Sequence, residues 1–177
     1  MTADTISKAV QRARNVLSRH PEAGIHADEP AIARWGQGLR VVCTHGNGTQ
    51  IATDLPAEIG GTGDQVSPGW LMRAGLASCV ATRIAMGAAA EGIVLTRLQV
   101  SATSTSDARG LFGMTTDLGE PITAGPRELR LKVLIGASGA SRERLQAIID
   151  ESYHCSPVSA ALVSAVPLAL HVEIDPS

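Results

Sequence analysis

Aromatic side chains are scarce in this chain of 177 residues. They make up 2% of it, as two tryptophans, one tyrosine and one phenylalanine. Charge is nearly balanced, because 15 lysines and arginines face 17 aspartates and glutamates, for a formal net charge of −2. Proteins that bind nucleic acid use a basic surface for the phosphates and often aromatic rings for the bases. We therefore expect no nucleic-acid partner.

Cysteines are few and far apart: Cys43, Cys79 and Cys155. Their spacing matches neither a zinc site nor a disulfide framework. The longest apolar segment is interrupted by Arg73 and Arg83, and the N-terminus lacks the apolar centre of a signal peptide. From these features we expect no metal, no bound cofactor, no membrane span and a cytoplasmic location.

What the chain does contain is one long apolar segment with helix signals at both ends. Ser67 is a favourable N-cap, Pro68 suits the first helical position, and Gly92 supplies a stop. Nearly every face between these signals is apolar, and such a helix must be covered on all sides. Cys79 lies at its middle. On the residues alone, Cys79 is either a small packing residue or a reactive thiol.

The other segments predict an α+β fold, because strands in hairpins are combined with separate helices. An amphipathic helix is expected over residues 5–18, in an N-terminal appendage and linker formed by residues 1–30, and residues 31–177 form the main domain. Expected strands cover residues 31–44, 50–54, 94–106, 128–135 and 168–174, with a tight turn at Asn47 and Gly48. Shorter helices are expected after Ser141 and over residues 158–164, and an irregular functional loop over residues 107–125.

Two stretches together resemble a known family. One runs from Gly60 to Cys79 and ends SPGWLMRAGLASC, and the other is HCSPVSAAL from His154, followed by VPLALHVEI. In these motifs the chain resembles the OsmC/Ohr family of organic hydroperoxide reductases, over roughly residues 31–174. The resemblance implies an antiparallel sheet packed on a long buried helix in an intertwined homodimer, which would explain a helix that is apolar on all faces.

The resemblance also implies a thiol-dependent peroxidase. A peroxidatic cysteine attacks the organic hydroperoxide, becomes a sulfenic acid and condenses with a resolving cysteine, and a dithiol reductant reopens the disulfide. Cys79 takes the peroxidatic position, Cys155 is the candidate resolving residue, and Arg40 is the candidate for the family's active-site arginine. Arg83 lies one turn beyond Cys79, where a cation lowers the pKa of a thiol. The alternative for Arg83 is an ion pair across an interface.

Three features differ from the family's pattern. Gly69 stands ten residues before the reactive cysteine, where the family has a glutamate that holds the arginine. Ser156, and not Cys155, directly precedes the proline, and one residue along a helix turns a side chain by ~100°. Trp70 is placed to reshape the pocket mouth. Glu58 is either a substitute carboxylate or a surface residue. The second hypothesis is a non-catalytic OsmC-like dimer that binds a small hydrophobic ligand at its interface.

Overall fold

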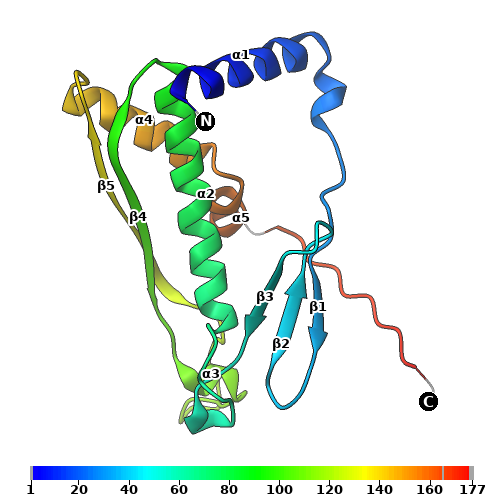
Figure 1. Cartoon of the computed structure of the whole chain (residues 1–177). Helices are drawn as coiled ribbons and strands as arrows, with labels where there is room; N and C mark the ends of the chain where they lie inside the picture. Colours follow the sequence, from blue (N-terminus) through cyan, green and yellow to red (C-terminus); the bar gives the residue numbers. More distant parts are fainter. Residues whose placement is uncertain (1, 165, 176–177) are drawn as a thin grey trace.

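The computed structural model describes residues 2–164 and 166–175. Its helices and strands form the α+β arrangement drawn in Figure 1. The elements are α1 (Ala3–Arg19), η1 (Pro21–Gly24), β1 (Ile32–Trp35), β2 (Val41–Thr44), β3 (Gln50–Thr53), η2 (Ala57–Ile59), α2 (Pro68–Ala90), β4 (Leu95–Thr105), α3 (Ala108–Leu111), β5 (Arg127–Ala137), α4 (Arg142–His154) and α5 (Pro157–Val163).

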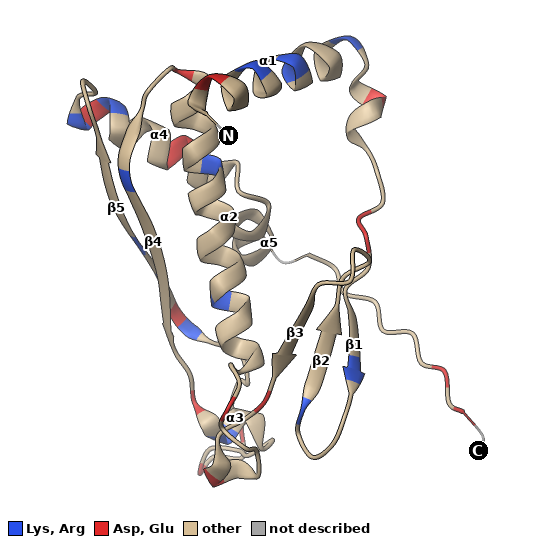
Figure 2. Ribbon diagram, in the orientation of Figure 1, with Lys and Arg blue, Asp and Glu red and all other residues tan. Residues whose placement is uncertain are grey.

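Helix α2 is the central element and begins and ends where the sequence predicts. The Ser67 hydroxyl accepts a hydrogen bond from the Trp70 N–H at 3.2 Å, and Pro68 is the first helical residue. After the C-cap Glu91, Gly92 has a φ of +69°, a conformation that glycine adopts without strain. In Figure 2 the helix is nearly all tan, because its only charged side chains are two arginines.

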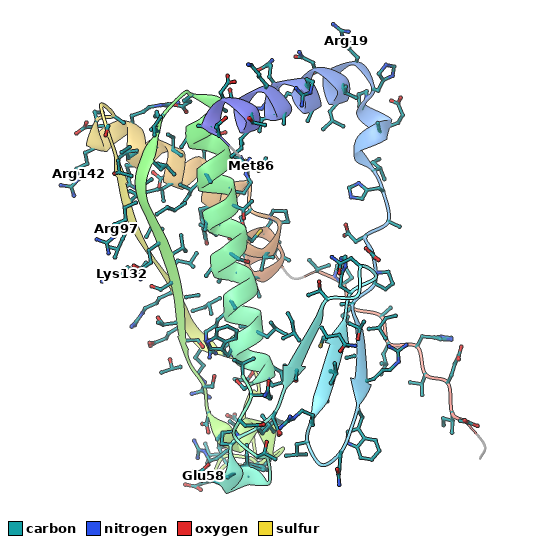
Figure 3. All side chains as sticks on the ribbon, in the orientation of Figure 1. Arg19, Glu58, Met86, Arg97, Lys132 and Arg142 are labelled. Atoms are coloured by element: carbon teal, nitrogen blue, oxygen red, sulfur yellow. The ribbon has the colours of Figure 1, made fainter. Side chains whose placement is uncertain are left out.

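The core lies between α2, the β4–β5 pair and α4. Its buried members are Leu76, Val80, Ile84 and Ile148. Strands β4 and β5 are antiparallel and turn alternate residues toward this cluster, in the register Leu98↔Ile135, Val100↔Val133 and Ala102↔Leu131. On their other face Arg97 and Lys132 point outward (Figure 3). The prediction of an antiparallel sheet packed on a long helix is confirmed.

Helix α2 is covered over part of its surface by other described elements. Strand β4 and helices α1, α4 and α5 contact it. On the rest of the helix Ser78 and Thr82 are exposed, and Trp70 is 49% exposed. The β1–β2–β3 sheet is joined to the loop before α2 by a bridge between Thr53 and Val66. The cover on all sides that the sequence predicts is therefore not achieved by a single chain.

The strand expected over residues 31–44 is two strands, which corrects that prediction. Strands β1 and β2 are separated by a turn in which the Gly36 N–H donates to the Arg40 carbonyl at 2.9 Å. Gly38 in this turn has a φ of +61°. With β3 they form an antiparallel sheet in the order β1–β2–β3. The predicted turn before β3 is confirmed, and its Gly48 has a φ of +89°.

The predicted last strand, residues 168–174, is not formed in this chain. Residues 166–175 run in an extended path away from the helices (Figure 1) and pair with no strand in the described part of the chain. Their apolar side chains are among the most exposed in the structure, with Leu168 at 96%, Leu170 at 88% and Ile174 at 85%. A strand must pair with a sheet edge to satisfy its backbone hydrogen bonds, and residues 166–175 pair with no sheet edge among the described residues.

The remaining elements lie close to their expected positions. Helix α1 is longer than predicted at both ends, lies across the end of α2 (Figure 1) and has no fully buried residue. The segment 107–125, expected to be irregular, contains the short helix α3 and a bridge between Thr115 and Pro121. Helix α4 begins after the N-cap Ser141, as predicted, and its Arg144 pairs with Glu91 just beyond α2.

Candidate active site

Cys79 contacts a buried hydroxyl. Its half-buried sulfur accepts a hydrogen bond from the Ser156 Oγ at 3.1 Å, and Ser156 is 0% exposed. Ser156 is held there by its role as N-cap of α5, since its Oγ accepts the Ser159 N–H at 3.4 Å. A serine before Pro157 is a strong helix-start signal. The local sequence therefore explains both the start of α5 and the hydroxyl that faces Cys79.

Cys155, the candidate resolving residue, lies on the surface. It is the C-cap of α4, and its N–H donates to the Glu151 carbonyl at 2.9 Å. Its side chain is exposed, whereas that of the next residue, Ser156, is completely buried. Cys43, Cys79 and Cys155 are all free thiols. The structure thus places Ser156, and not Cys155, against the Cys79 sulfur.

Arg83 is the cation that α2 carries one turn beyond Cys79. The residue is half-buried, and its Nε atom is buried without a hydrogen-bond partner among the described residues. A buried guanidinium nitrogen without an acceptor is unfavourable, and an anion or a polar group from another molecule would satisfy it. The alternative for Arg83, an ion pair across an interface, stays a prediction because it requires a second chain.

Arg40 lies in a separate polar cluster. Its Nε and Nη2 each donate to Asp54 Oδ2 at 3.1 Å, and Nη2 also donates to Thr62 Oγ1 at 2.7 Å. A further ion pair joins Arg40 to Asp64. The Thr62 hydroxyl, the Leu55 N–H and the Arg40 guanidinium all lower the pKa of the buried Asp54 carboxyl. Two carboxylates therefore neutralise the single charge of Arg40.

This cluster links β2 to the loop that leads into α2. Thr62 and Asp64 belong to that loop, and Asp54 follows β3 directly. Gly61 allows the loop to fold tightly, since a Cβ there would lie 1.8 Å from the Leu55 carbonyl oxygen. Arg40 also lines a cavity of about 530 Å³ beside the β1–β2 turn. Within residues 2–164 and 166–175, Arg40 and Cys79 form no hydrogen bond with each other.

At Gly69, where the family has a glutamate, no carboxylate of the described residues lies within 4 Å of the Cβ position. At Gly69 the nearest side-chain atom to a built Cβ is Arg73 Nη1, at 3.7 Å. Arg73 itself donates to Ser104 Oγ at 3.3 Å. Glu58 is exposed on η2 and points away from the centre of α2 (Figure 3), so it is a surface residue. Trp70 lies beside a shallow pocket at the start of α2 and is half-exposed.

A smaller apolar cavity lies next to the Cys79 region. It has a volume of about 210 Å³ and is lined by Leu76, Leu129, Leu131, Tyr153, Ser159, Leu162 and Val163. Leu76 is on α2, one turn before Cys79. Ser159 is 3% exposed, and its Oγ has no hydrogen-bond partner in the described residues. An unsatisfied hydroxyl in an apolar cavity is a place where a ligand's polar group can bind.

The histidines and the possible metal ligands of the described residues form no further candidate site. All five histidines are exposed, and His45 Nε2 lies 3.3 Å from Glu29 on the surface. Within the ranges that the structure describes, no three His, Cys, Asp or Glu side chains gather as metal ligands would. None of the helices in those ranges has both the length and the hydropathy to cross a membrane.

The sequence identifies Cys79 as a candidate residue, but it does not indicate the hydrogen bond between Cys79 and Ser156. Ser156 was noted for its place before the proline, and nothing in its spacing from Cys79 indicates a hydrogen bond between them. Asp54, Thr62 and Asp64 were not identified as partners of Arg40. The only sequence signals for these partners are an acidic residue directly after a strand and a glycine-rich loop, which needs contacts to other elements to hold its conformation.

Comparison with known proteins agrees with the fold described above. A family model described as "OsmC-like protein" matches residues 61–171. An OsmC-like protein from Mycoplasma pneumoniae matches with a TM-score of 0.64 at 18% identity, covering 80% of this chain and 91% of its own. An OsmC-like protein of unknown function from Vibrio cholerae matches with a TM-score of 0.58 at 14% identity, covering 77% of this chain and 94% of its own.

An organic hydroperoxide resistance protein from Elizabethkingia anophelis, with thiocyanate bound, matches with a TM-score of 0.56 at 18% identity, covering 80% of this chain and 91% of its own. At these identities the structural likeness establishes the fold alone. No curated protein sequence matches the chain.

Proposed function

Because this chain belongs to the OsmC-like protein family, we propose that it is a thiol-dependent peroxidase that reduces organic hydroperoxides through Cys79. The observation that carries the proposal is the hydrogen bond from the buried Ser156 hydroxyl to the Cys79 sulfur at 3.1 Å. A donor aimed at sulfur favours the thiolate over the thiol, and the thiolate is the nucleophile. The name of the Elizabethkingia relative, an organic hydroperoxide resistance protein, supports the substrate class.

Arg83 is the cation that we propose for this site. It lies one turn from Cys79 on the same helix, and its buried Nε has no partner in the described chain. A guanidinium in this position stabilises both the thiolate and the alkoxide that leaves when the O–O bond breaks. Arg40 stays a second candidate from the family resemblance, although its charge is already neutralised by Asp54 and Asp64.

We also propose that the protein works as a homodimer. Helix α2 has one uncovered side, and the segment 166–175 exposes apolar side chains at every second position: Val166, Leu168, Leu170, Val172 and Ile174. Alternation of this kind is typical of a strand with one buried face. A second copy of the chain would supply both the sheet edge and the cover for α2, whose exposed apolar area is otherwise unfavourable in water.

Peroxide consumption tests the proposed activity. Wild-type protein with cumene hydroperoxide and the dithiol dihydrolipoamide should consume the hydroperoxide catalytically, and Cys79→Ser should reduce the rate to background. Cys43→Ser is the matched control, because Cys43 is another half-buried free thiol but lies on β2. If wild type and Cys79→Ser, both with reduced thiols at the start, consume the hydroperoxide equally and only at the background rate, the proposed peroxidase activity is excluded.

A second function is favoured by the apolar cavity beside α2. Its unsatisfied Ser159 hydroxyl and apolar lining fit the polar end and chain of a small hydrophobic molecule. Calorimetric titration with 1-octanol as the probe should then give saturable binding that is weakened in Ser159→Val. If this binding occurs while Cys79→Ser retains wild-type peroxide consumption, the protein is a ligand-binding member of the family and not a peroxidase.

A further inference from the structure

The residue that faces the Cys79 sulfur carries a hydroxyl and not a second thiol. We infer that Cys79 is a single-cysteine centre whose sulfenic acid is reduced by a thiol from another molecule. The inference rests on the proposed peroxidase activity and specifies how its catalytic cycle is completed. It depends on three observations: the fixed position of Ser156, the exposed position of Cys155 and the partial exposure of Cys79.

Ser156 is fixed by both its hydrogen bonds and its burial. Its N–H donates to the Tyr153 carbonyl at 3.4 Å, its Oγ accepts from the Ser159 N–H at 3.4 Å, and its hydroxyl proton points to Cys79. No part of the side chain is exposed. A serine hydroxyl cannot form a bond equivalent to a disulfide with an oxidised sulfur. Ser156 therefore stabilises and orients the Cys79 sulfur, as a positioning residue, without completing the redox step.

Cys155 is not placed to attack Cys79. A disulfide requires Cβ atoms about 3.5–4.5 Å apart and S–S contact. Ser156 Oγ contacts the Cys79 sulfur, whereas the neighbouring Cys155 side chain is exposed. To exchange the two side chains, the end of α4 must unwind, breaking the hydrogen bond from the Cys155 N–H to Glu151. It must also break the N-cap contact of α5, in which the Ser156 Oγ accepts from the Ser159 N–H.

The chemistry balances with two external thiols. The Cys79 thiolate attacks the terminal oxygen of ROOH, the O–O bond breaks, and the alkoxide takes a proton to leave as ROH, with Cys79 as the sulfenic acid. A first thiol R′SH attacks the sulfenic sulfur and releases water, which leaves a mixed disulfide on Cys79. A second R′SH attacks the outer sulfur of this disulfide, releasing R′SSR′ and the Cys79 thiolate. Half-buried Cys79 remains accessible to such a thiol.

Trapping experiments on the full chain test this inference without any substitution. One equivalent of cumene hydroperoxide should leave wild-type protein with dimedone-reactive sulfenic acid on Cys79 and a free thiol on Cys155. Adding 2-mercaptoethanol in place of dimedone should produce a mixed disulfide on Cys79 and then restore the thiol. Many turnovers with this monothiol should also persist in Cys155→Ser.

Ser156→Cys provides a second test, because it places a thiol where the hydroxyl now contacts Cys79. This variant should form an intramolecular disulfide between positions 79 and 156 and lose the dimedone adduct. A Cys79–Cys155 disulfide in wild-type protein, or loss of turnover in Cys155→Ser, would overturn the single-cysteine inference while leaving the peroxidase proposal intact. Absence of both peroxide consumption and sulfenic acid would overturn the two together.

Discussion

At the scale of single residues, the chemistry of Cys79 depends on which of two neighbouring side chains turns inward. Cys155 ends α4 and is exposed, while Ser156 begins α5 and is buried against the sulfur. The difference follows from helix punctuation, because an N-cap side chain folds back onto the first turn of its helix. The same bond that starts α5 thus fixes the hydroxyl beside Cys79.

Ser156→Ala should slow alkylation of Cys79 by iodoacetamide at neutral pH, because it removes the hydroxyl that donates to the sulfur. A hydrogen bond to a charged group contributes about 1.5–3 kcal/mol, so a loss of about tenfold in rate is expected. Ser156→Thr, which keeps the hydroxyl, should restore the rate. If the alanine variant is folded by circular dichroism and its alkylation rate matches wild type, Ser156 acts only as a helix cap.

Arg83→Met should also slow alkylation of Cys79 at neutral pH, because a cation one turn away favours attack by the sulfur. Arg83→Lys should retain most of the wild-type rate, since the charge is kept. Arg73→Met is the control, because Arg73 lies on the same helix and is bound to Ser104. Identical alkylation rates for the Arg73 and Arg83 methionine variants would assign Arg83 to structure.

At the scale of the elements, close approaches and polar links hold the helices in place around the site. Gly87 permits α4 to pack tightly on α2, since a Cβ there would lie 3.2 Å from Ile148 Cγ2. The pair between Glu91 and Arg144 joins the end of α2 to the start of α4. Because Ser156 follows α4, these contacts determine where its hydroxyl meets α2.

Asp107 holds the segment between β4 and β5 through its ion pairs with Arg109 and Arg127, and we expect these pairs to be lost in acid. Hydrogen bonds from Arg109, together with the charge of Arg127, lower the pKa of Asp107 from 3.8 to about 2. The ionised form is favoured in the folded chain, so its contribution to stability is present above about pH 4 and is lost as the pH falls toward 2.

Hydrogen exchange of residues 107–125 should therefore speed up between pH 4 and pH 2, after correction for the intrinsic pH dependence of exchange. Asp107→Asn should show fast exchange already at neutral pH. Asp117→Asn is a suitable control, because Asp117 is an exposed carboxylate in the same segment. If hydrogen exchange of residues 107–125 depends on pH in the same way in wild type and in Asp107→Asn, the proposed role of Asp107 is contradicted.

At the scale of the whole molecule, one chain leaves two surfaces open that a second copy could cover. One is the side of α2 that faces away from β4 and α4, and the other is the alternating apolar face of residues 166–175. Both belong to elements that the sequence marks as buried. A homodimer in which each surface is covered by the other copy accounts for both.

Leu170→Lys should shift the protein from dimer to monomer or aggregate in sedimentation at micromolar concentration, because a charge would enter the proposed buried face of the C-terminal segment. His171→Lys is the matched control, since the next residue of a strand points to the opposite face. A stable monomer of the wild-type protein, or equal behaviour of the two variants, would contradict the dimer.

Local sequence determined the elements of this protein. The caps Ser67, Ser141 and Ser156 fix where helices begin, and alternation fixes β4 and β5, because these signals act between residues close along the chain. One turn was missed, since Gly36 and Gly38 divide what reads as a single strand. The family was also evident from the motif that ends at Cys79.

Only the tertiary structure decided which side chains meet. That Ser156 faces Cys79 across 77 positions of sequence depends on how α4 packs on α2, and no local pattern contains that information. The same holds for Arg40, whose partners Asp54 and Asp64 meet it because a loop folds back on β2. The alternation of apolar residues predicts a strand in the C-terminal segment, but one chain does not form it. A strand forms only where its backbone can pair with the edge of a sheet.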